Sequence, residues 1–334
     1  MTNEELLEVV RQASGDPDAA LAGAPTPLTG GFWAELVAFR LAGEDRNVVA
    51  RFMPDATIAA KETCIQRTVA ELGFPTPTVR LWGGPDVGRG RAFMVMDRVE
   101  GRALLADLDG VAAIRRLPTL ARDIPRLLGS TMADLHRLDA GAIAADLAEA
   151  DVQVPTVSKL AAHLEETAAA YGRDDLVTSA RWLLDRPPVV SDDVVCHGDL
   201  HPFNVLLDDS GAPVVLDWSA SLLAPREYDV AFTELLLSDP PLAVPAALGP
   251  LVGAAGRLLA RRFRREYVAV SGVELDVESL RWHRALLCLR GLVEVAGWVA
   301  GGGVEAHAGH PWLTLGPAFA GRLASTTGVV VRSR

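Results

Sequence analysis

The strongest constraint on the fold is a change in sequence pattern near residue 100. Before it, apolar residues form short strand-like runs at residues 35–41, 47–53 and 91–97. Beyond about residue 103, apolar residues recur at the spacing of a helix face. We therefore predict an α+β protein with two domains, a small lobe with an antiparallel sheet over residues 1–98 and a larger, mainly helical lobe over residues 99–334.

Composition agrees with two domains and limits the partners. The chain has 334 residues, of which 49% are hydrophobic, enough for two domains of roughly 150 residues each. Its net charge of −11 argues against nucleic acid or an anionic membrane as the main partner. The three cysteines are widely spaced, so neither a disulfide framework nor a zinc site is indicated. The first ten residues carry acids, whereas a secretory signal would carry basic residues there. We expect a cytoplasmic protein.

A helix is predicted over residues 56–72, with Asp55 as its N-cap and Gly73 after its end. Glu62 lies on the apolar face of this helix, since its spacing from the apolar residues places them all on one side. The apolar residues of this face are Ile58, Ile65, Val69 and Leu72. A buried carboxylate is costly without a cation, and Arg51 on the preceding strand is the expected partner. Such a pair either serves a functional site or only joins helix to strand, and the sequence leaves both interpretations open.

Polar side chains interrupt strand formers in "VVCHGDLHPFNVLLDDSGAPVVLDW", residues 194–218. Residues 194–196, 205–207 and 214–216 are predicted strands, and "DDSG" is a turn between the last two. Asp199 and Asn204 then share one tight loop, whereas Asp217 ends a hairpin strand. Carboxylate and amide oxygens in such a group suit Mg²⁺, which binds through one or two carboxylates together with substrate phosphates.

The strings "HGDLHPFN" and "VVLDW" resemble the catalytic and metal-binding segments of the aminoglycoside phosphotransferase family, small-molecule kinases with a protein-kinase-like bilobal fold. The resemblance implies transfer of the γ-phosphate of ATP, or of GTP, to a hydroxyl of a small molecule. It implies that Asp199 orients the hydroxyl and accepts its proton. It further implies that Asn204 and Asp217 hold Mg²⁺, and that His197 is structural.

The resemblance also assigns nucleotide-binding residues in the first lobe. Arg51 and Glu62 match the basic residue and helix glutamate that position the phosphates, and "AFMVMDRVEG" resembles the hinge that connects the lobes. The assigned nucleotide-binding residues are Arg51, Glu62, Thr29, Gly30, Gly31 and Met96. Three departures stand out: arginine replaces lysine at position 51, Ser219 replaces the glycine of D-F-G, and "TGGFW" is a poor glycine-rich loop.

Three other interpretations of the polar residues in segment 194–218 remain. A metal-dependent hydrolase would use His197, Asp199, His201 and Asp217 around zinc or iron. An inactive nucleotide-binding module would keep the fold without the chemistry, and an ordinary loop would keep the polar residues without either. The hydrolase leaves Asn204 and Glu62 without a role.

The acceptor is the least constrained part of the prediction. Asp229 either braces the catalytic loop or faces the substrate, and bracing is favoured. Glu294 either pairs with Arg290 on one helix or projects toward the acceptor, while Glu274 lies at an exposed helix start. An antibiotic such as an aminoglycoside is the leading acceptor, and a metabolite such as a choline-like amine, a sugar or a nucleoside is the alternative. The oligomeric state is left open.

Overall fold

The structure is a computed structural model that describes residues 1–28, 34–104, 110–189, 192–240 and 249–334. The chain forms two compact units, each built from three segments. The first unit contains Met1–Ala106, Leu138–Val154 and Pro202–Ser221, and the second contains Asp107–Arg137, Pro155–His201 and Leu222–Arg334. The division into lobes over residues 1–98 and 99–334 is a division by function, which the compact units do not test, and it stays a prediction.

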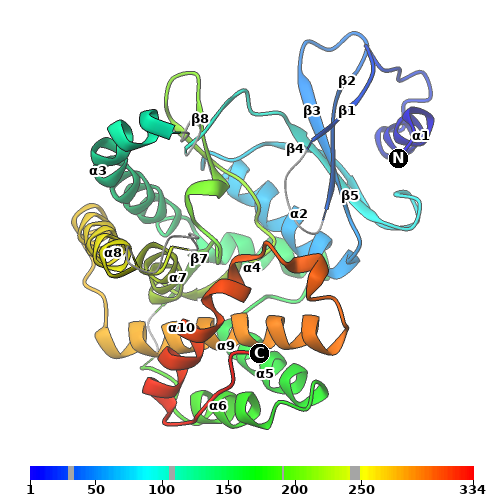
Figure 1. The fold of residues 1–334 in the computed structure, drawn as a ribbon. Helices are drawn as coiled ribbons and strands as arrows, with labels where there is room; N and C mark the ends of the chain where they lie inside the picture. The colour runs from blue at the N-terminus through cyan, green and yellow to red at the C-terminus, as the bar shows by residue number, and fades with distance from the viewer. Residues whose placement is uncertain (29–33, 105–109, 190–191, 241–248) are drawn as a thin grey trace. The chain divides into compact units, whose positions relative to one another are not determined.

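The first unit contains a five-stranded antiparallel sheet with the strand order β1-β2-β3-β5-β4 (Figure 1). Its strands are β1 (Thr26–Leu28), β2 (Glu35–Arg40), β3 (Asn47–Met53), β4 (Val79–Gly83) and β5 (Ala92–Asp97). The strands predicted at residues 35–41, 47–53 and 91–97 are confirmed as β2, β3 and β5.

Each face of this sheet has its own apolar core. Helix α1 (Asn3–Ser14) packs Leu6, Val9 and Val10 against one face, where it meets Phe52 and Phe93. On the other face, helix α2 (Ala56–Glu71) contributes Ala59 to a cluster with Met53 and Met94. Neighbouring residues of β3 and β5 therefore point to opposite faces, as pleating requires. The same alternation directs Arg51 to the α2 face.

Helix α2 matches the predicted residues 56–72, but its buried face is wider than the predicted stripe. Asp55 caps it, because its carboxylate accepts hydrogen bonds from the amides of Thr57 and Ile58. Glu62 is fully buried, as predicted, whereas Ile58 and Leu72 are 45% and 39% exposed and correct the stripe at its two ends. Helix α4 (Ala140–Glu149) packs against α2 as well, so the middle of α2 is covered on two sides and its ends are not.

A three-stranded antiparallel sheet completes the first unit, in the order β6-β8-β9. Its strands are β6 (Gly101–Ala103), β8 (Val205–Asp208) and β9 (Pro213–Val215), and the short 3₁₀ helix η1 (Pro202–Asn204) leads into β8. Strands β8 and β9 form the predicted hairpin. The predicted hinge "AFMVMDRVEG" ends at Gly101, which begins β6, and the pairing of β6 with β8 involves main-chain groups of exposed residues.

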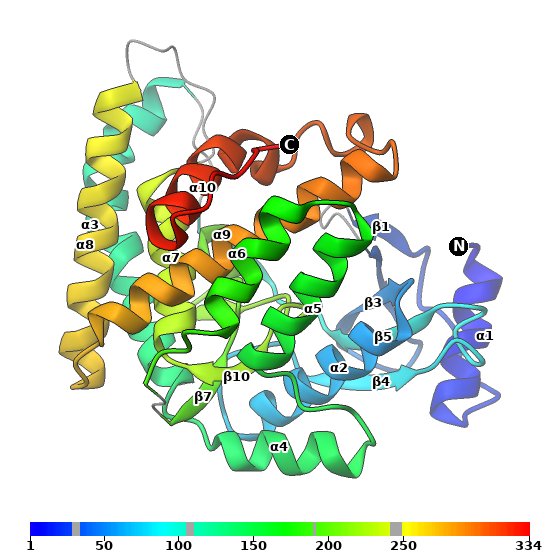
Figure 2. The same cartoon turned by 90° about the horizontal axis from the view of Figure 1, so that it is seen from below.

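The second unit is mainly helical, as predicted. Most residues of helix α9 (Val277–Ala300) are buried, because it packs against α5 (Val157–Ala170), α6 (Asp174–Leu184), α7 (Glu227–Ser238) and α10 (Pro311–Thr327) (Figure 2). A two-stranded antiparallel sheet joins β7 to β10. The elements are α3 (Gly110–Leu135), α5 (Val157–Ala170), α6 (Asp174–Leu184), β7 (Asp193–Cys196), β10 (Leu222–Pro225), α7 (Glu227–Ser238), α8 (Gly249–Ser271), α9 (Val277–Ala300), η3 (Glu305–His307) and α10 (Pro311–Thr327).

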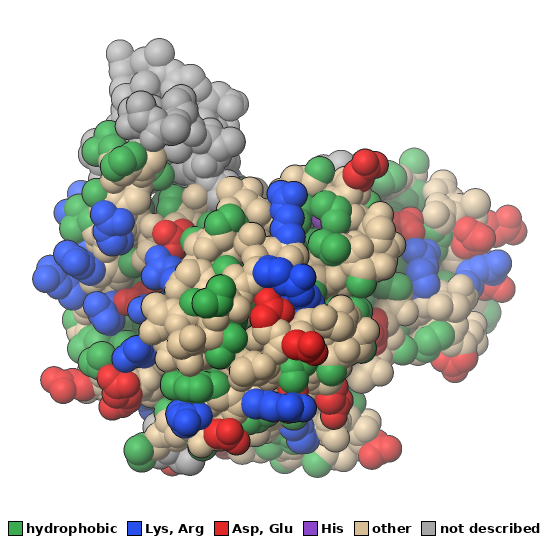
Figure 3. Space-filling model, turned by 60° about the horizontal axis from the view of Figure 1, so that its bottom comes forward, with side chains coloured by type: hydrophobic (Ala, Val, Ile, Leu, Met, Phe, Trp, Pro, Cys, Tyr) green, Lys and Arg blue, Asp and Glu red, His purple; other side chains and the backbone are tan. Residues whose placement is uncertain are grey.

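Charged side chains of both signs are interspersed on the face in Figure 3, with apolar side chains in small groups between them. In the described part of the chain, no helix combines the length and apolar character needed to cross a bilayer. The three cysteines, Cys64, Cys196 and Cys288, are free and buried.

Candidate active site

The second unit presents Asp199 on a loop directly after strand β7. The strand is anchored by its pairing with β10, in which Cys196 lies opposite Leu222. Gly198 then takes a positive φ of 74°, a conformation that glycine adopts without strain. The turn at Gly198 therefore ends the strand and begins the loop that carries Asp199.

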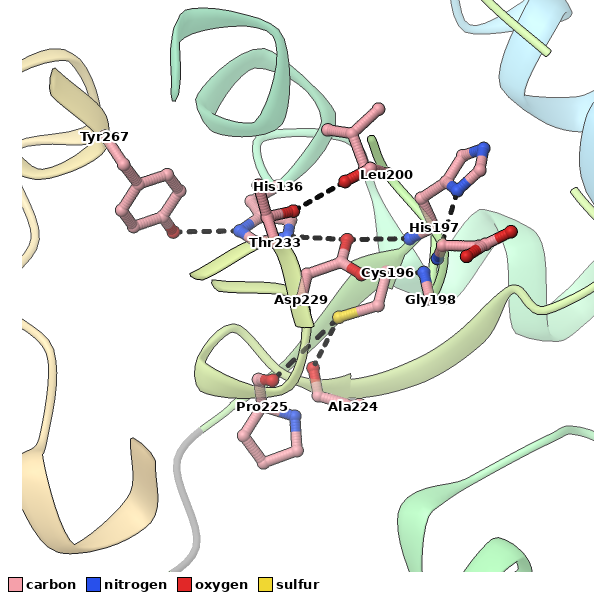
Figure 4. Close-up of polar contacts among 11 residues, drawn as sticks. His136, Cys196, His197, Gly198, Leu200, Ala224, Pro225, Asp229, Thr233 and Tyr267 are labelled. Atoms are coloured by element: carbon pink, nitrogen blue, oxygen red, sulfur yellow. Dashed lines mark hydrogen bonds and ion pairs between the residues drawn. The ribbon is translucent and has the colours of Figure 1, made fainter. Parts of the chain in front are cut away.

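Asp229 of α7 holds this loop by its main chain (Figure 4). Its carboxylate is fully buried and accepts hydrogen bonds from the amide of His197 at 2.7 Å and from that of Gly198 at 2.6 Å. A carboxylate with two amide donors is well compensated for its burial. The expected bracing role of Asp229 is confirmed by these contacts.

Three further contacts fix neighbouring atoms of the loop. Arg290 of α9 donates from Nη1 to the carbonyl of Gly198 at 3.2 Å, and Thr233 of α7 donates to the carbonyl of Leu200 at 2.7 Å. The amide of Asp199 donates to Nδ1 of the buried His197 at 3.2 Å, so the predicted structural role of His197 agrees with its contacts. Hydrogen bonds therefore fix the loop backbone at several consecutive residues. The side chain of Asp199 itself is 29% exposed.

Asp229 is connected to a deeper network that the sequence did not indicate. Nε2 of His136 lies 3.4 Å from the Asp229 carboxylate, and its Nδ1 lies 2.8 Å from the hydroxyl of Tyr267. Cys196 lies close to both side chains, so that the ligand atoms of His136, Cys196 and Asp229 are spaced as in a metal site. However, burial raises the pKa of the Cys196 thiol well above its ordinary value, and the thiol contacts the carbonyl of Ala224. The Asp229 carboxylate of this group already accepts two amide hydrogen bonds from the loop, so we assign the group to bracing.

The first unit brings Asn204 and Asp217 to one end of the β8–β9 hairpin. Asn204 directly precedes β8, and Asp217 follows β9 by two residues. The amide of Leu216 donates to the carbonyl of Asn204 at 2.9 Å, which extends the ladder beyond the pair formed by Val205 and Val215. The donor set of one carboxylate and one amide oxygen fits Mg²⁺, which takes oxygen ligands and keeps several waters.

The backbone at Asp217 adopts an unusual conformation. Its φ of 64° is in the left-handed region, which is uncommon for a residue other than glycine. The next residue, Trp218, is fully buried, and its indole N–H donates to the hydroxyl of Thr76 at 2.9 Å. The amide of Ser219 donates to Oδ1 of Asp217 at 3.3 Å. These contacts turn the Asp217 carboxylate out of the strand while the tryptophan anchors the chain.

Arg51 and Glu62 form the predicted ion pair on the α2 face of the sheet. Nη2 of Arg51 lies 3.4 Å from Oε1 of Glu62 and also donates to Oδ1 of Asp217 at 3.1 Å. Burial raises the pKa of Glu62 to about 7, the charge of Arg51 opposes this rise, and the charge of Asp217 adds to it. One guanidinium nitrogen therefore lies beside two carboxylates, and its positive charge stabilises the ionised form of both.

The remaining expected residues are less informative. Thr29, Gly30 and Gly31 lie outside the described residues. Met96 lies near the end of β5, where its sulfur accepts a contact from Nε2 of Gln66 at 3.5 Å.

The acceptor candidates belong to the second unit and make other contacts. Glu294 accepts a hydrogen bond from the indole of Trp312 at 2.9 Å, and Arg290 donates to the carbonyl of Gly198. Burial raises the pKa of Glu294, and the nearby charge of Arg290 opposes this rise. Glu274 is exposed just before α9, whose N-cap is Asp276, as expected for a helix start.

Comparison with known proteins gives a family. A family model described as the phosphotransferase enzyme family matches residues 26–247. An aminoglycoside 3'-phosphotransferase from Streptomyces fradiae is 32% identical over 224 residues, which cover 64% of this chain and 73% of that protein.

Two solved structures show the likeness in fold. A thermostable mutant of aminoglycoside phosphotransferase APH(4)-Ia, in a ternary complex with ADP and hygromycin B, superposes with a TM-score of 0.59 at 18% identity, covering 92% of this chain and 94% of that chain. Macrolide 2'-phosphotransferase MphH from Brachybacterium faecium superposes with a TM-score of 0.56 at 17% identity, covering 94% and 98%. At these identities the likeness establishes the fold alone.

The antiparallel sheet with helix α2 and the mainly helical second unit define the kinase-like α+β fold of small-molecule phosphotransferases. The chain belongs to the phosphotransferase enzyme family, as the resemblance of "HGDLHPFN" and "VVLDW" to aminoglycoside phosphotransferases predicted. This membership overturns the metal-dependent hydrolase. It also gives the motif residues a common origin that an ordinary loop would lack.

Proposed function

We propose that the chain transfers the γ-phosphate of ATP to a hydroxyl of an aminoglycoside-type antibiotic, with Mg²⁺ as cofactor. The observation that carries the proposal is the position of Arg51 between the carboxylates of Glu62 and Asp217. A fixed cation next to a carboxylate at the open end of a hairpin is the arrangement that a metal-bound polyphosphate requires. GTP is the alternative phosphoryl donor, because solved neighbours hold ADP in one case and GDP in another.

Mg²⁺ would be held by Asp217 and Asn204, and when bound it neutralises charge on the phosphates. Arg51 would bind phosphate oxygens, while Glu62 keeps the guanidinium in place. The nucleotide-binding roles of Thr29, Gly30, Gly31 and Met96 are part of the same proposal. Little covalent chemistry is asked of these side chains, since phosphoryl transfer depends on alignment and charge neutralisation.

Asp199 would act on the acceptor. The acceptor oxygen forms a bond to the γ-phosphorus, the bond from that phosphorus to the β–γ bridging oxygen breaks, and the hydroxyl proton passes to the Asp199 carboxylate. The products are ADP and the phosphorylated acceptor. The contacts of His197, Gly198 and Leu200 support this role, because a loop held through its main chain keeps the side chain of Asp199 in a constant position.

The acceptor class rests on the relative from Streptomyces fradiae, whose name states an aminoglycoside 3'-phosphotransferase. A net charge of −11 is compatible with a polycationic acceptor. A metabolite kinase is the alternative, and the two differ only in the acceptor that supports turnover.

The test is ADP release from ATP and Mg²⁺ with aminoglycosides, macrolides, nucleosides and amino alcohols as acceptors. The proposal expects aminoglycoside-dependent turnover that falls at least about 100-fold in Asp199→Ala. The matched control is Asp209→Ala, because Asp209 is exposed in the turn between β8 and β9. Turnover with a metabolite alone would identify the alternative, and a melting shift with Mg²⁺ and ATP but no turnover would favour the inactive nucleotide-binding module.

A further inference from the structure

Lys61 occupies a notable position in a chain that uses arginine almost exclusively. The sequence contains only two lysines, Lys61 and Lys159, among 32 basic residues. Lys159 is exposed on α5, whereas Lys61 is half-buried on α2, one residue before Glu62. Its ammonium donates a hydrogen bond to the main-chain carbonyl of Ser219 at 2.7 Å. The lysine on α2 therefore contacts the segment that carries Asp217.

The segment around Ser219 follows strand β9 and is held by contacts with other parts of the first unit. Strand β9 ends at Val215, so Asp217 to Ser219 lie outside the regular ladder. Trp218 is anchored through Thr76, and its carbonyl accepts a hydrogen bond from the amide of Ser221 at 3.1 Å. The carbonyl of Ser219 is fixed from outside the segment by Lys61.

Besides the contact of Glu62 with the backbone of Trp218, two connections run from α2 to this segment, and they differ in what a bound cation does to them. The first passes from Glu62 through Arg51 to Oδ1 of Asp217. A metal ion on the Asp217 carboxylate would compete with Arg51 for that oxygen. The second passes from Lys61 to the carbonyl of Ser219 and does not involve the carboxylate, so it is compatible with a bound metal ion.

We propose that Lys61 is a positioning residue for the metal-binding aspartate: by holding the Ser219 carbonyl, it keeps the turn at Asp217 in the conformation that binds the metal–nucleotide complex. The inference rests on the proposed function, because it takes Asp217 as a Mg²⁺ ligand. Its action differs from that of Arg51, since Lys61 acts through the backbone. An ammonium is suited to the role because it is a compact donor on a flexible stem.

The experiment measures the dissociation constant of ADP by calorimetry, with and without Mg²⁺, for the wild type, Lys61→Met, Lys61→Arg and Lys159→Met. Removal of a hydrogen bond from a charged donor predicts about tenfold weaker binding of ADP with Mg²⁺ in Lys61→Met. Binding of ADP without Mg²⁺ stays unchanged in the same variant, which separates positioning of the aspartate from general damage. Lys61→Arg restores most of the Mg²⁺ effect, because guanidinium also donates, and Lys159→Met behaves as the wild type.

Two results would overturn the inference in distinguishable ways. If Mg²⁺ tightens ADP binding equally in the wild type and in Lys61→Met, Lys61 does not position the metal site, and the proposed function stands. If the wild type itself binds no ADP with or without Mg²⁺, the proposed function fails and the inference fails with it. Lys61→Gln, which keeps a polar end, provides a second variant if Lys61→Met has a lowered melting temperature.

Discussion

Nη2 of Arg51 donates a hydrogen bond to Oδ1 of Asp217 at 3.1 Å, although 166 residues separate the two in the sequence. The same nitrogen lies 3.4 Å from Glu62, so the three side chains form one charged group inside the first unit. Both oxygens of Glu62 are buried. The ionised state of Glu62 is favoured chiefly by the nearby charge of Arg51, and to a smaller extent by the charge of Lys61 and a contact with the backbone of Trp218.

The first prediction concerns the pH dependence that Glu62 gives to stability. Burial raises its pKa from 4.5 to about 7, so between these values the folded chain binds a proton that the unfolded chain has released. The stabilisation is complete below pH 4.5 and is lost as the pH rises to about 7, a change on the order of 3 kcal/mol. We expect Glu62→Gln to remove this part of the pH dependence of the free energy of unfolding, measured by urea denaturation.

Glu71→Gln is the matched control, because Glu71 lies on the same helix with its side chain 67% exposed. Its pH profile should follow that of the wild type. Parallel profiles for Glu62→Gln and the wild type would contradict a raised pKa at Glu62.

The second prediction concerns the Asp229 carboxylate, which holds the loop that carries Asp199. Asn in place of Asp229 keeps one acceptor but turns an NH₂ group toward an amide donor, so one of the bonds to His197 and Gly198 is lost inside the protein. We expect Asp229→Asn to lower the free energy of unfolding by about 3 kcal/mol and acceptor-dependent turnover by at least about tenfold.

Thr233→Val is the comparison, since it removes a single neutral hydrogen bond to the same loop, at Leu200. Its expected cost is about 1 kcal/mol. Equal effects of the two variants would show that the charge of Asp229 adds nothing to the hold on the loop.

The third prediction concerns thiol reactivity. Burial raises the pKa of Cys64 and of Cys288 to about 12, and that of Cys196 also lies far above its ordinary value. Because the thiolate is the reactive form, none of the three should react with a disulfide reagent at about pH 8 in the folded protein. All three should react in urea. Fast reaction of one thiol without urea, traced by peptide mass, would show that its surroundings open.

The parts of the fold that the sequence predicted are those with local signals. Strands β2, β3 and β5 carry apolar runs long enough to recognise, and α2 has both an N-cap and a stop signal. Strand β6 carries no such signal, since all of its side chains are exposed and its place is fixed by main-chain bonds to β8. Strand β4, "VRLWG", was not predicted from the sequence, although in the structure its more buried and more exposed side chains alternate.

The candidate site also has a part that the sequence predicted and a part that it did not. The loop that carries Asp199 and the β8–β9 hairpin follow one another closely in the sequence, so a motif can reveal them. Their supports come from distant segments: His136 reaches Asp229 over 93 residues, and Arg290 reaches Gly198 over 92. A single histidine or arginine on a helix has no spacing that points to such a partner. The pairing of Arg51 with Glu62 was predictable because a buried carboxylate requires a cation nearby.

The last prediction concerns the choice of arginine at position 51. In Arg51→Met, both carboxylates lose their cation, and since the charge of Arg51 lowers the pKa of Glu62, that pKa should rise further. We expect a loss of about 3 kcal/mol in the free energy of unfolding and a weaker affinity for ADP with Mg²⁺. In Arg51→Lys, an ammonium keeps the charge on a shorter side chain and its distances to Glu62 and Asp217 change, so the loss should be about 1 kcal/mol, with ADP binding retained.

The control for both variants is Arg40→Met, because Arg40 is exposed at the end of β2. Denaturation and calorimetry on the four proteins separate the contributions, since charge is lost in Arg51→Met and only geometry changes in Arg51→Lys. If Arg51→Lys loses as much stability as Arg51→Met, the two carboxylates require the reach and geometry of the guanidinium as well as its charge. If neither variant differs from Arg40→Met, the ion group does not stabilise the first unit, and the role assigned to Arg51 in phosphate binding would have to rest on the ADP affinities alone.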